Sequence, residues 1–217
     1  MFVGHYAAAL AAKAAAPRGP LWTYVAAAQL IDIGWSSLVM AGVETVSFNP
    51  ELAGSPLVLD HMPWTHGLPA AAVWSLAGLL AARFVARLPW RTALVVGLVV
   101  LSHWGLDWLV HRPDLELWPG GDKVGLGGWN WPTAEKVLEI GLVAIAGGAW
   151  LWKRGAHGRT AWPAVLFLAF LTALQIIAEL TEPTGSVFAY MRLSLATFIG
   201  VTLVAALVDL GKYRDEA

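Results

Sequence analysis

Long apolar segments alternate with short polar connections along most of the chain. An α-helix rises about 1.5 Å per residue, so about 20 apolar residues cross the roughly 30 Å hydrocarbon core of a bilayer. The pattern predicts six full membrane spans, over residues 21–42, 66–87, 91–111, 133–153, 160–180 and 188–211. Residues 3–16 are also apolar but too short for a standard span, so we expect a short additional helix there, which crosses only in a thin bilayer or inside the bundle. The predicted fold class is all-α, a polytopic membrane helical bundle of about seven helices.

The composition agrees with one membrane domain over residues 1–217. Hydrophobic residues make up 58% of the chain and charged residues 13%, whereas soluble domains carry roughly 25% charged residues. The net charge of −1 offers no basic surface to nucleic acid, so we expect no nucleic-acid partner. The chain has no cysteine, which excludes disulfides and thiolate ligands and leaves imidazole and carboxylate to hold any metal.

The distribution of Lys and Arg predicts the orientation, because short cytoplasmic loops carry an excess of both. Basic residues gather in alternate connections and at the C-terminus: Lys13, Arg18, Arg83, Arg87, Arg91, Lys153, Arg154, Arg159, Lys212 and Arg214. The connections at 43–65, 112–132 and 181–187, the last with Glu182, are mainly acidic and should face outward. We therefore expect a multi-pass protein of the bacterial cytoplasmic membrane with a cytoplasmic C-terminus. The Gly- and Trp-rich loop 112–132 should lie over the outer surface.

Three polar residues recur at a spacing of four in and just after the apolar run at 93–110. His103 and Asp107 lie within this run, and His111 follows it directly. Each step of four turns an α-helix by about 40°, so two imidazoles and one carboxylate share a helical face. An aspartate at mid-bilayer costs roughly 2.5–3.5 kcal/mol on insertion scales. A bound metal cation would offset that cost.

Further potential ligands fall on the same expected outer side. The full set of expected metal ligands is His5, Asp32, His61, His66, His103, Asp107, His111, Glu135 and Glu139. Imidazole with carboxylate suits Zn²⁺, with Mn²⁺ or Fe²⁺ as alternatives, and the number of ligands predicts two ions bridged by Asp107. We expect Asp107 and Glu139 to act in catalysis, with Glu135 as an alternative proton carrier, and Arg112 to grip an anionic group.

The same residues carry a resemblance to a known family. The shared features are Gly4 and His5, the stretches 29–32 and 61–66, residues 102–107, and residues 111–114 with Trp129 and Asn130. Over roughly its first two-thirds the chain resembles bacterial inner-membrane proteins catalogued as metal-dependent hydrolases, which include a LexA-regulated member. That family is distantly similar to the all-helical superfamily of zinc-dependent phospholipase C and single-strand nucleases.

The resemblance to this superfamily implies an ordered set of metal ligands. These are His5, Asp32, His66, His103, Asp107 and His111. The chain departs from the superfamily where Glu135 and Glu139 stand in place of a His and an Asp, which weakens the case for a third metal. It also begins with Met1 in place of the superfamily's Trp, so the backbone amine is not carried over as a ligand.

We expect a membrane-embedded metal-dependent hydrolase that cleaves a phosphoester bond in a phospholipid or lipid-like substrate, a bond identified only through the resemblance. The alternative is a metal-ion or proton transporter that uses the same His and Asp cluster. A transport path should continue to the other face, and the expected cytoplasmic halves of the helices carry few ionisable groups. A third possibility is a non-catalytic scaffold. Expected partners are membrane lipids and a lipid or small-molecule substrate, and the sequence predicts no oligomeric state.

Several of these residues also have ordinary structural interpretations. His61 can shape the turn before the span at 66–87. Glu135 can be a helix N-terminal acid favoured by the helix dipole. Glu179 and Arg192 can pair between the last two helices. Most of the 13 tryptophans are expected at the membrane interfaces.

Overall fold

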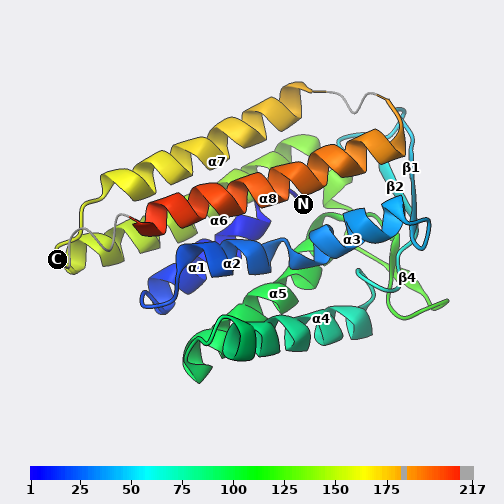
Figure 1. Cartoon of the computed structure of the whole chain (residues 1–217). Coiled ribbons are helices and arrows are strands. Elements are labelled where there is room, and N and C mark those ends of the chain that lie inside the picture. Colours follow the sequence, from blue (N-terminus) through cyan, green and yellow to red (C-terminus); the bar gives the residue numbers. More distant parts are fainter. Residues whose placement is uncertain (182–184, 211–217) are drawn as a thin grey trace.

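The computed structural model describes residues 1–181 and 185–210, which form one helical bundle (Figure 1). In chain order its helices are α1 (His5–Ala15), α2 (Leu21–Ala28), α3 (Leu30–Met40), α4 (Leu68–Leu80), α5 (Trp90–Val110), α6 (Pro132–Ala156), α7 (Trp162–Leu180) and α8 (Val187–Leu210). The chain is thus a helical membrane protein, as its hydropathy predicts. Glu182, Lys212 and Arg214 lie outside the described residues.

Four helical segments of the described chain are long and apolar enough to cross a membrane. They are Leu68–Val85, in which α4 continues into a π-helical turn, η1 (Ala81–Val85), and Trp90–Val110, Trp162–Leu180 and Val187–Asp209. Helix α6 is 25 residues long but carries charged residues near both ends. The prediction of six full spans is therefore confirmed for four.

The predicted span at 21–42 is two helices instead of one. Helices α2 and α3 meet at Gln29, whose φ of −112° and ψ of 9° leave the α-helical region. Average hydropathy over residues 21–42 does not detect such a break, because both helices are apolar. The break has a consequence for the site, since Gln29 Nε2 donates to the carbonyl of Phe2 (3.3 Å) and thereby contacts the N-terminal segment.

The connections at one end of the bundle form two short antiparallel hairpins, which an all-α prediction does not include (Figure 1). Strand β1 (Thr45–Phe48) pairs with β2 (Leu57–His61), and β3 (Leu115–Glu116) pairs with β4 (Lys123–Val124). Lys123 Nζ donates to the carbonyls of Leu59 and Asp60 and so ties the hairpins together. The predicted loop 112–132 therefore contains β3, β4 and a 3₁₀ turn, η2 (Gly128–Asn130).

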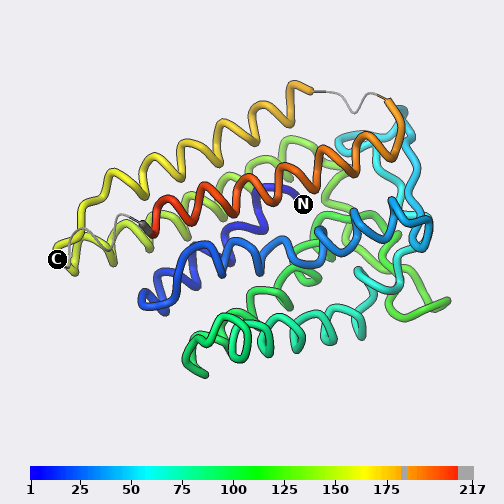
Figure 2. Tube along the Cα trace, viewed as in Figure 1, coloured from blue at the N-terminus to red at the C-terminus, as the bar shows by residue number. Residues whose placement is uncertain are grey.

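The short helix α1 lies inside the bundle. Tyr6, Ala9 and Leu10 have no exposed surface, and α1 packs against α2, α5 and α6. In Figure 2 the N-terminal tube runs into the middle of the molecule. The outer helices instead expose apolar side chains, such as Ile145 at 75% and Leu203 at 62%, which suits contact with lipid.

Candidate metal centre

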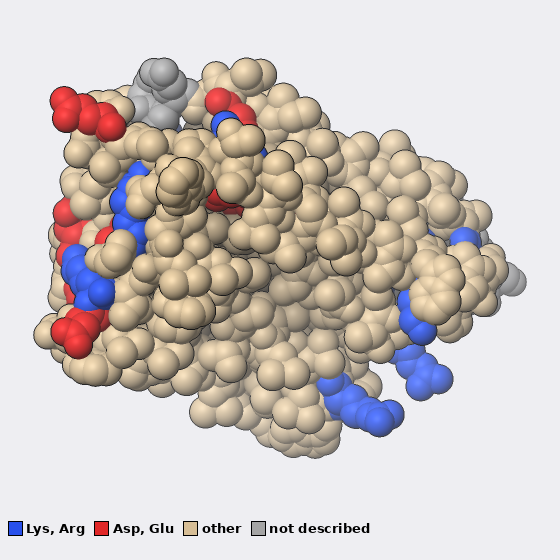
Figure 3. Space-filling view, turned by 180° about the vertical axis from the view of Figure 1, so that it is seen from behind, with Lys and Arg blue, Asp and Glu red and all other residues tan. Residues whose placement is uncertain are grey.

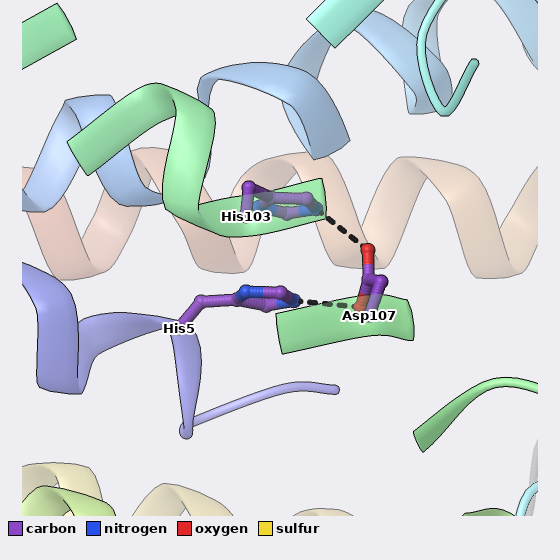
Figure 4. Close-up of side chains that lie close together, drawn as sticks. All are labelled: His5, His103 and Asp107. Atoms are coloured by element: carbon purple, nitrogen blue, oxygen red, sulfur yellow. Dashed lines mark ion pairs between the residues drawn. The ribbon is translucent and has the colours of Figure 1, made fainter. Parts of the chain in front are cut away.

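Helix α5 presents His103 and Asp107 one turn apart, and His5 approaches them from the start of α1 (Figure 4). His5 Nε2 lies 3.1 Å from Asp107 Oδ1, and His103 Nε2 lies 3.1 Å from Asp107 Oδ2. The two imidazole rings stack with their centroids 3.7 Å apart. Each of the three residues is 1% exposed. Sequence positions about a hundred residues apart thus meet in one buried group.

Asp32 of α3 and His66, which precedes α4, complete one side of this group. His66 Nε2 lies 3.4 Å from Asp32 Oδ1 and 3.5 Å from Asp107 Oδ2. His103 Nε2 lies 3.5 Å from Asp32 Oδ1. Asp32 Oδ1 and Asp107 Oδ2 thus each lie within 3.5 Å of both imidazole nitrogens, and Asp32, His66 and His103 form one buried group that could hold a metal ion.

The other oxygen of Asp107 faces a different set of groups. His111 Nε2 lies 3.4 Å from Asp107 Oδ1, which His5 also approaches. The amino nitrogen of Met1 lies 2.9 Å from the same oxygen, a contact that sequence reasoning missed. Burial lowers the pKa of this amino group, but the carboxylates of Asp107, Glu139 and Asp32 together raise it by more, so the pKa lies above its ordinary value. The carboxylate of Asp107 thus stands between two groups of nitrogen atoms.

Hydrogen bonds at the far ring nitrogens fix which nitrogen of each histidine faces the cluster. His103 Nδ1 lies 2.8 Å from the Ala28 carbonyl, at the end of α2, and His111 Nδ1 lies 3.2 Å from Asp114 Oδ1. Carbonyl and carboxylate oxygens only accept, so Nδ1 carries the hydrogen in both rings. In the neutral rings Nε2 then presents a lone pair to the cluster, as in most metal-bound histidines.

His66 is oriented through a chain of two further side chains. Thr65 Oγ1 donates to Glu44 Oε2 (2.7 Å), so its oxygen accepts from His66 Nδ1 (2.9 Å). Glu44 is 1% exposed and also accepts from the backbone N–H of Trp64 and Thr65. Sequence reasoning counted Glu44 only among acidic loop residues, because a positioning residue of this kind has no spacing signature.

An imidazole lone pair and a carboxylate oxygen repel each other at hydrogen-bond distance. A positive charge between them is needed to hold them together. In the described part of the chain His5 Nε2, His103 Nε2 and Asp107 Oδ2 are buried without a hydrogen-bond partner, although only 3.1 Å separates each imidazole from the carboxylate. The imidazole nitrogens and the Asp107 oxygens are not aligned as in a hydrogen bond, which disfavours a proton shared between them. Ligands at roughly 2.0–2.2 Å from a tetrahedral Zn²⁺ lie roughly 3.3–3.6 Å from one another, close to the observed 3.1–3.5 Å. The donor set therefore fits a transition-metal ion.

Three residues of the expected ligand set lie outside this cluster. His61, in β2, has a side chain that is 49% exposed, and its Nδ1 contacts Glu116 Oε1 (2.8 Å). Glu139 of α6 accepts from the backbone N–H of Phe2 (2.8 Å) and Gly4 (3.2 Å). Glu135 lies one turn before Glu139 and is partly buried. Glu139 thus fastens the N-terminal segment that carries His5.

Arg112 braces the loop beside His111. Its Nε donates to Asn130 Oδ1 (3.0 Å) and its Nη2 to the Ser55 carbonyl (3.1 Å). Its guanidinium lies over the Trp129 ring, whose centroid is 3.9 Å from that of His111. Nη1 is buried and has no hydrogen-bond partner among the described residues.

Comparison with known proteins identifies one family. The sequence profile of the YdjM inner membrane protein family matches residues 1–181. The matched range includes all six residues of the cluster: His5, Asp32, His66, His103, Asp107 and His111. No curated protein and no solved structure matches the chain.

Proposed function

This chain belongs to the YdjM inner membrane protein family, and we propose that it is a metal-dependent hydrolase embedded in that membrane. One observation supports this proposal most directly. Imidazole nitrogens and carboxylate oxygens of buried His and Asp residues lie close together without aligned hydrogen bonds. The two buried carboxylates of Asp32 and Asp107 outnumber the one ammonium group of Met1. The cluster therefore needs further positive charge, and a divalent ion would supply it with the geometry these residues offer.

The two oxygens of Asp107 divide the ligands into two sets. Asp32, His66, His103 and Asp107 Oδ2 would hold one ion. His5, His111 and Asp107 Oδ1 would hold a second, with the Met1 amine beside them. Zn²⁺ suits both sets, and Mn²⁺ or Fe²⁺ are alternatives. A pair of bound ions would supply an activated water and a clamp for the oxygens of a phosphoryl group.

A phosphoester in a phospholipid or lipid-like molecule is the substrate class we propose. The lipid-facing helices keep the cluster within reach of the membrane, and two-metal sites suit phosphoryl transfer. Arg112 would orient the anionic group after its guanidinium turns toward it, because Nη1 is buried and the other donors bind the loops. Glu139 would keep His5 in place through Phe2 and Gly4, and Glu135 or Glu139 would move protons.

Metal analysis of purified protein tests the two-ion arrangement. We expect about two equivalents of transition metal in the wild type and the loss of one equivalent in His66→Ala and in His111→Ala. His157→Ala is the matched control, because His157 contacts only the Lys153 carbonyl at the end of α6 among its described hydrogen bonds. Equal metal content in all four proteins would rule out the metal centre.

Hydrolysis is tested separately on protein of known metal content. Phospholipids of several headgroups are incubated with the metal-loaded wild type, with a chelated sample and with a reconstituted sample, and released phosphate or headgroup is measured. We expect activity that chelation removes and metal restores. Full metal occupancy without cleavage of any phosphoester would refute the hydrolase and leave a metal-binding protein.

Transport is the alternative, and one observation bears on it. A buried pair, Lys13 Nζ and Asp209 Oδ1 at 3.5 Å, lies toward the other end of the bundle. On α1, Lys13 is eight residues beyond His5, or about 12 Å. Ala9 and Leu10 lie between these two residues on α1 without exposed surface, and neither contributes a polar group to a path for an ion. We therefore favour the hydrolase.

A further inference from the structure

A mainly apolar cavity of about 250 Å³ lies between helices α6 and α7. It is open toward the molecular surface, where Ile140, Ala144 and Thr172 are exposed. Its α6 wall is formed by Glu139, Ile140, Val143 and Ala144, and its α7 wall by Leu168, Thr172 and Gln175. Val3 closes the inner side.

Contacts at both ends hold the two helices around this cavity. At one end Gly147 of α6 lets Leu168 approach closely: a Cβ there would lie 2.6 Å from Leu168 Cδ2, so the leucine side chain would have to shift. At the other end Lys136 of α6 forms an ion pair with Glu179 of α7, in place of the Glu179–Arg192 pair considered from sequence. About 16 Å of α6 separates Lys136 from Gly147. In Figure 1 α7 runs along the edge of the bundle, as expected for a helix that contacts its neighbours at few points.

The lining also contains one unsatisfied polar atom. Gln175 of α7 is 5% exposed, and its side-chain oxygen has no hydrogen-bond partner among the described residues. Its Nε2 donates to Glu179 Oε1 (3.1 Å), which fixes the orientation of the amide and turns the oxygen away from Glu179. A buried acceptor without a donor is destabilising, so a ligand that supplies a donor would be retained here.

We propose that this cavity binds one hydrocarbon chain of a membrane lipid whose polar end donates a hydroxyl or amide hydrogen to Gln175 Oε1. Small apolar cavities do not hold water stably, and the helices that line this one lie among lipid chains. None of the six clustered His and Asp residues lines the cavity, although Glu139 lines it and also binds the N-terminal segment that carries His5. The inference therefore does not depend on hydrolase activity.

Photolabelling of the full chain in detergent tests the site. The probe is a monoacylglycerol with a diazirine in its acyl chain, and its fully O-methylated analogue lacks the donor. We expect labelled peptides that contain Ile140, Ala144 or Thr172. Ala144→Trp should fill the cavity and reduce labelling to background, whereas Ile145→Trp, on the adjacent residue that is 75% exposed to lipid, should leave it unchanged.

The hydrogen bond is tested with Gln175→Leu. Binding of the monoacylglycerol should weaken about two- to tenfold, the range for one neutral hydrogen bond, while binding of the O-methylated analogue stays the same. Gel filtration and thermal unfolding establish that each variant folds, and Thr172→Trp fills the cavity from α7 if Ala144→Trp does not fold. Labelling spread over the lipid-facing sides of α4 and α8, or reduced equally by Ile145→Trp, would overturn the proposal.

Discussion

Asp107 is the residue on which the candidate centre depends. Each of its oxygens faces a different set of nitrogen atoms, and its side chain is 1% exposed. A buried carboxylate of this kind is stable only when several positive or hydrogen-donating groups surround it. Asp32, by contrast, approaches only His66 and His103.

This difference predicts unequal effects of two similar substitutions. Asp107→Asn should remove both ions because the amide cannot bridge them, whereas Asp32→Asn should remove one. Metal content of purified variants at equal expression measures the effect. Equal losses in the two variants would contradict the bridging role of Asp107.

Thr65 connects Glu44 to His66 through one hydroxyl group. Thr65→Val removes that link and keeps the side-chain volume, so we expect metal affinity to fall by roughly 10–100-fold, as is typical when the partner of a ligating histidine is lost. Thr65→Ser keeps the hydroxyl and should retain wild-type affinity. Competition with a fluorescent chelator measures both. If Thr65→Ser bound metal as weakly as Thr65→Val, packing of the methyl group would explain the loss instead.

Among the elements, the break between α2 and α3 is the most informative. It ends α2 at Ala28, whose carbonyl accepts from His103 Nδ1. It also brings Gln29 to the N-terminal segment. Hydropathy predicted one span over this region, because an average over apolar residues does not register where a helix stops.

Helix α1 is fixed at its far end by Lys13, which is 2% exposed. Lys13 Nζ contacts Asp209 of α8 and the Gly19 carbonyl. Lys13→Met should lower the free energy of unfolding by about 3–5 kcal/mol, the usual effect of breaking a buried ion pair. Adding Asp209→Asn should restore part of this loss. Thermal unfolding in detergent measures both variants, and an unchanged midpoint in Lys13→Met would show that the pair contributes little.

Several residues that meet in the cluster were predictable from the sequence, whereas the helix break at Gln29 and the two hairpins were not. The spacing of His103, Asp107 and His111 was sufficient to place them together, since helical geometry is local. The approach of His5 and Asp32 depended on the resemblance and on topology. Glu139 and His61 lie outside the cluster, because their positions follow from how α6 and the first hairpin pack. Glu44 was missed for the same reason.

At the scale of the whole molecule, charge separates toward opposite ends. Figure 3 shows acidic side chains gathered at one end, where some basic ones accompany them, and only basic side chains at the other, with a mostly uncharged surface between. The acidic end carries the hairpins and the loop that follows His111. From the positive-inside rule we expect that end to face away from the cytoplasm.

Cysteine labelling tests this orientation directly, because the chain contains no cysteine of its own. An impermeant maleimide added to intact cells should label Asp122→Cys, in the loop before β4, and should label Ala156→Cys, at the end of α6, only after lysis. The reverse pattern would place the cluster near the cytoplasmic face.

The burial of α1 also has a consequence for how the protein is made. This helix leaves the ribosome before two of the helices that enclose it, α5 and α6, which follow much later in the chain. Until they are inserted, α1 cannot reach its native surroundings, and His5 cannot meet Asp107. During assembly in the membrane, α1 must therefore remain without its native contacts to α5 and α6. The cluster forms only after those helices have been synthesised and inserted.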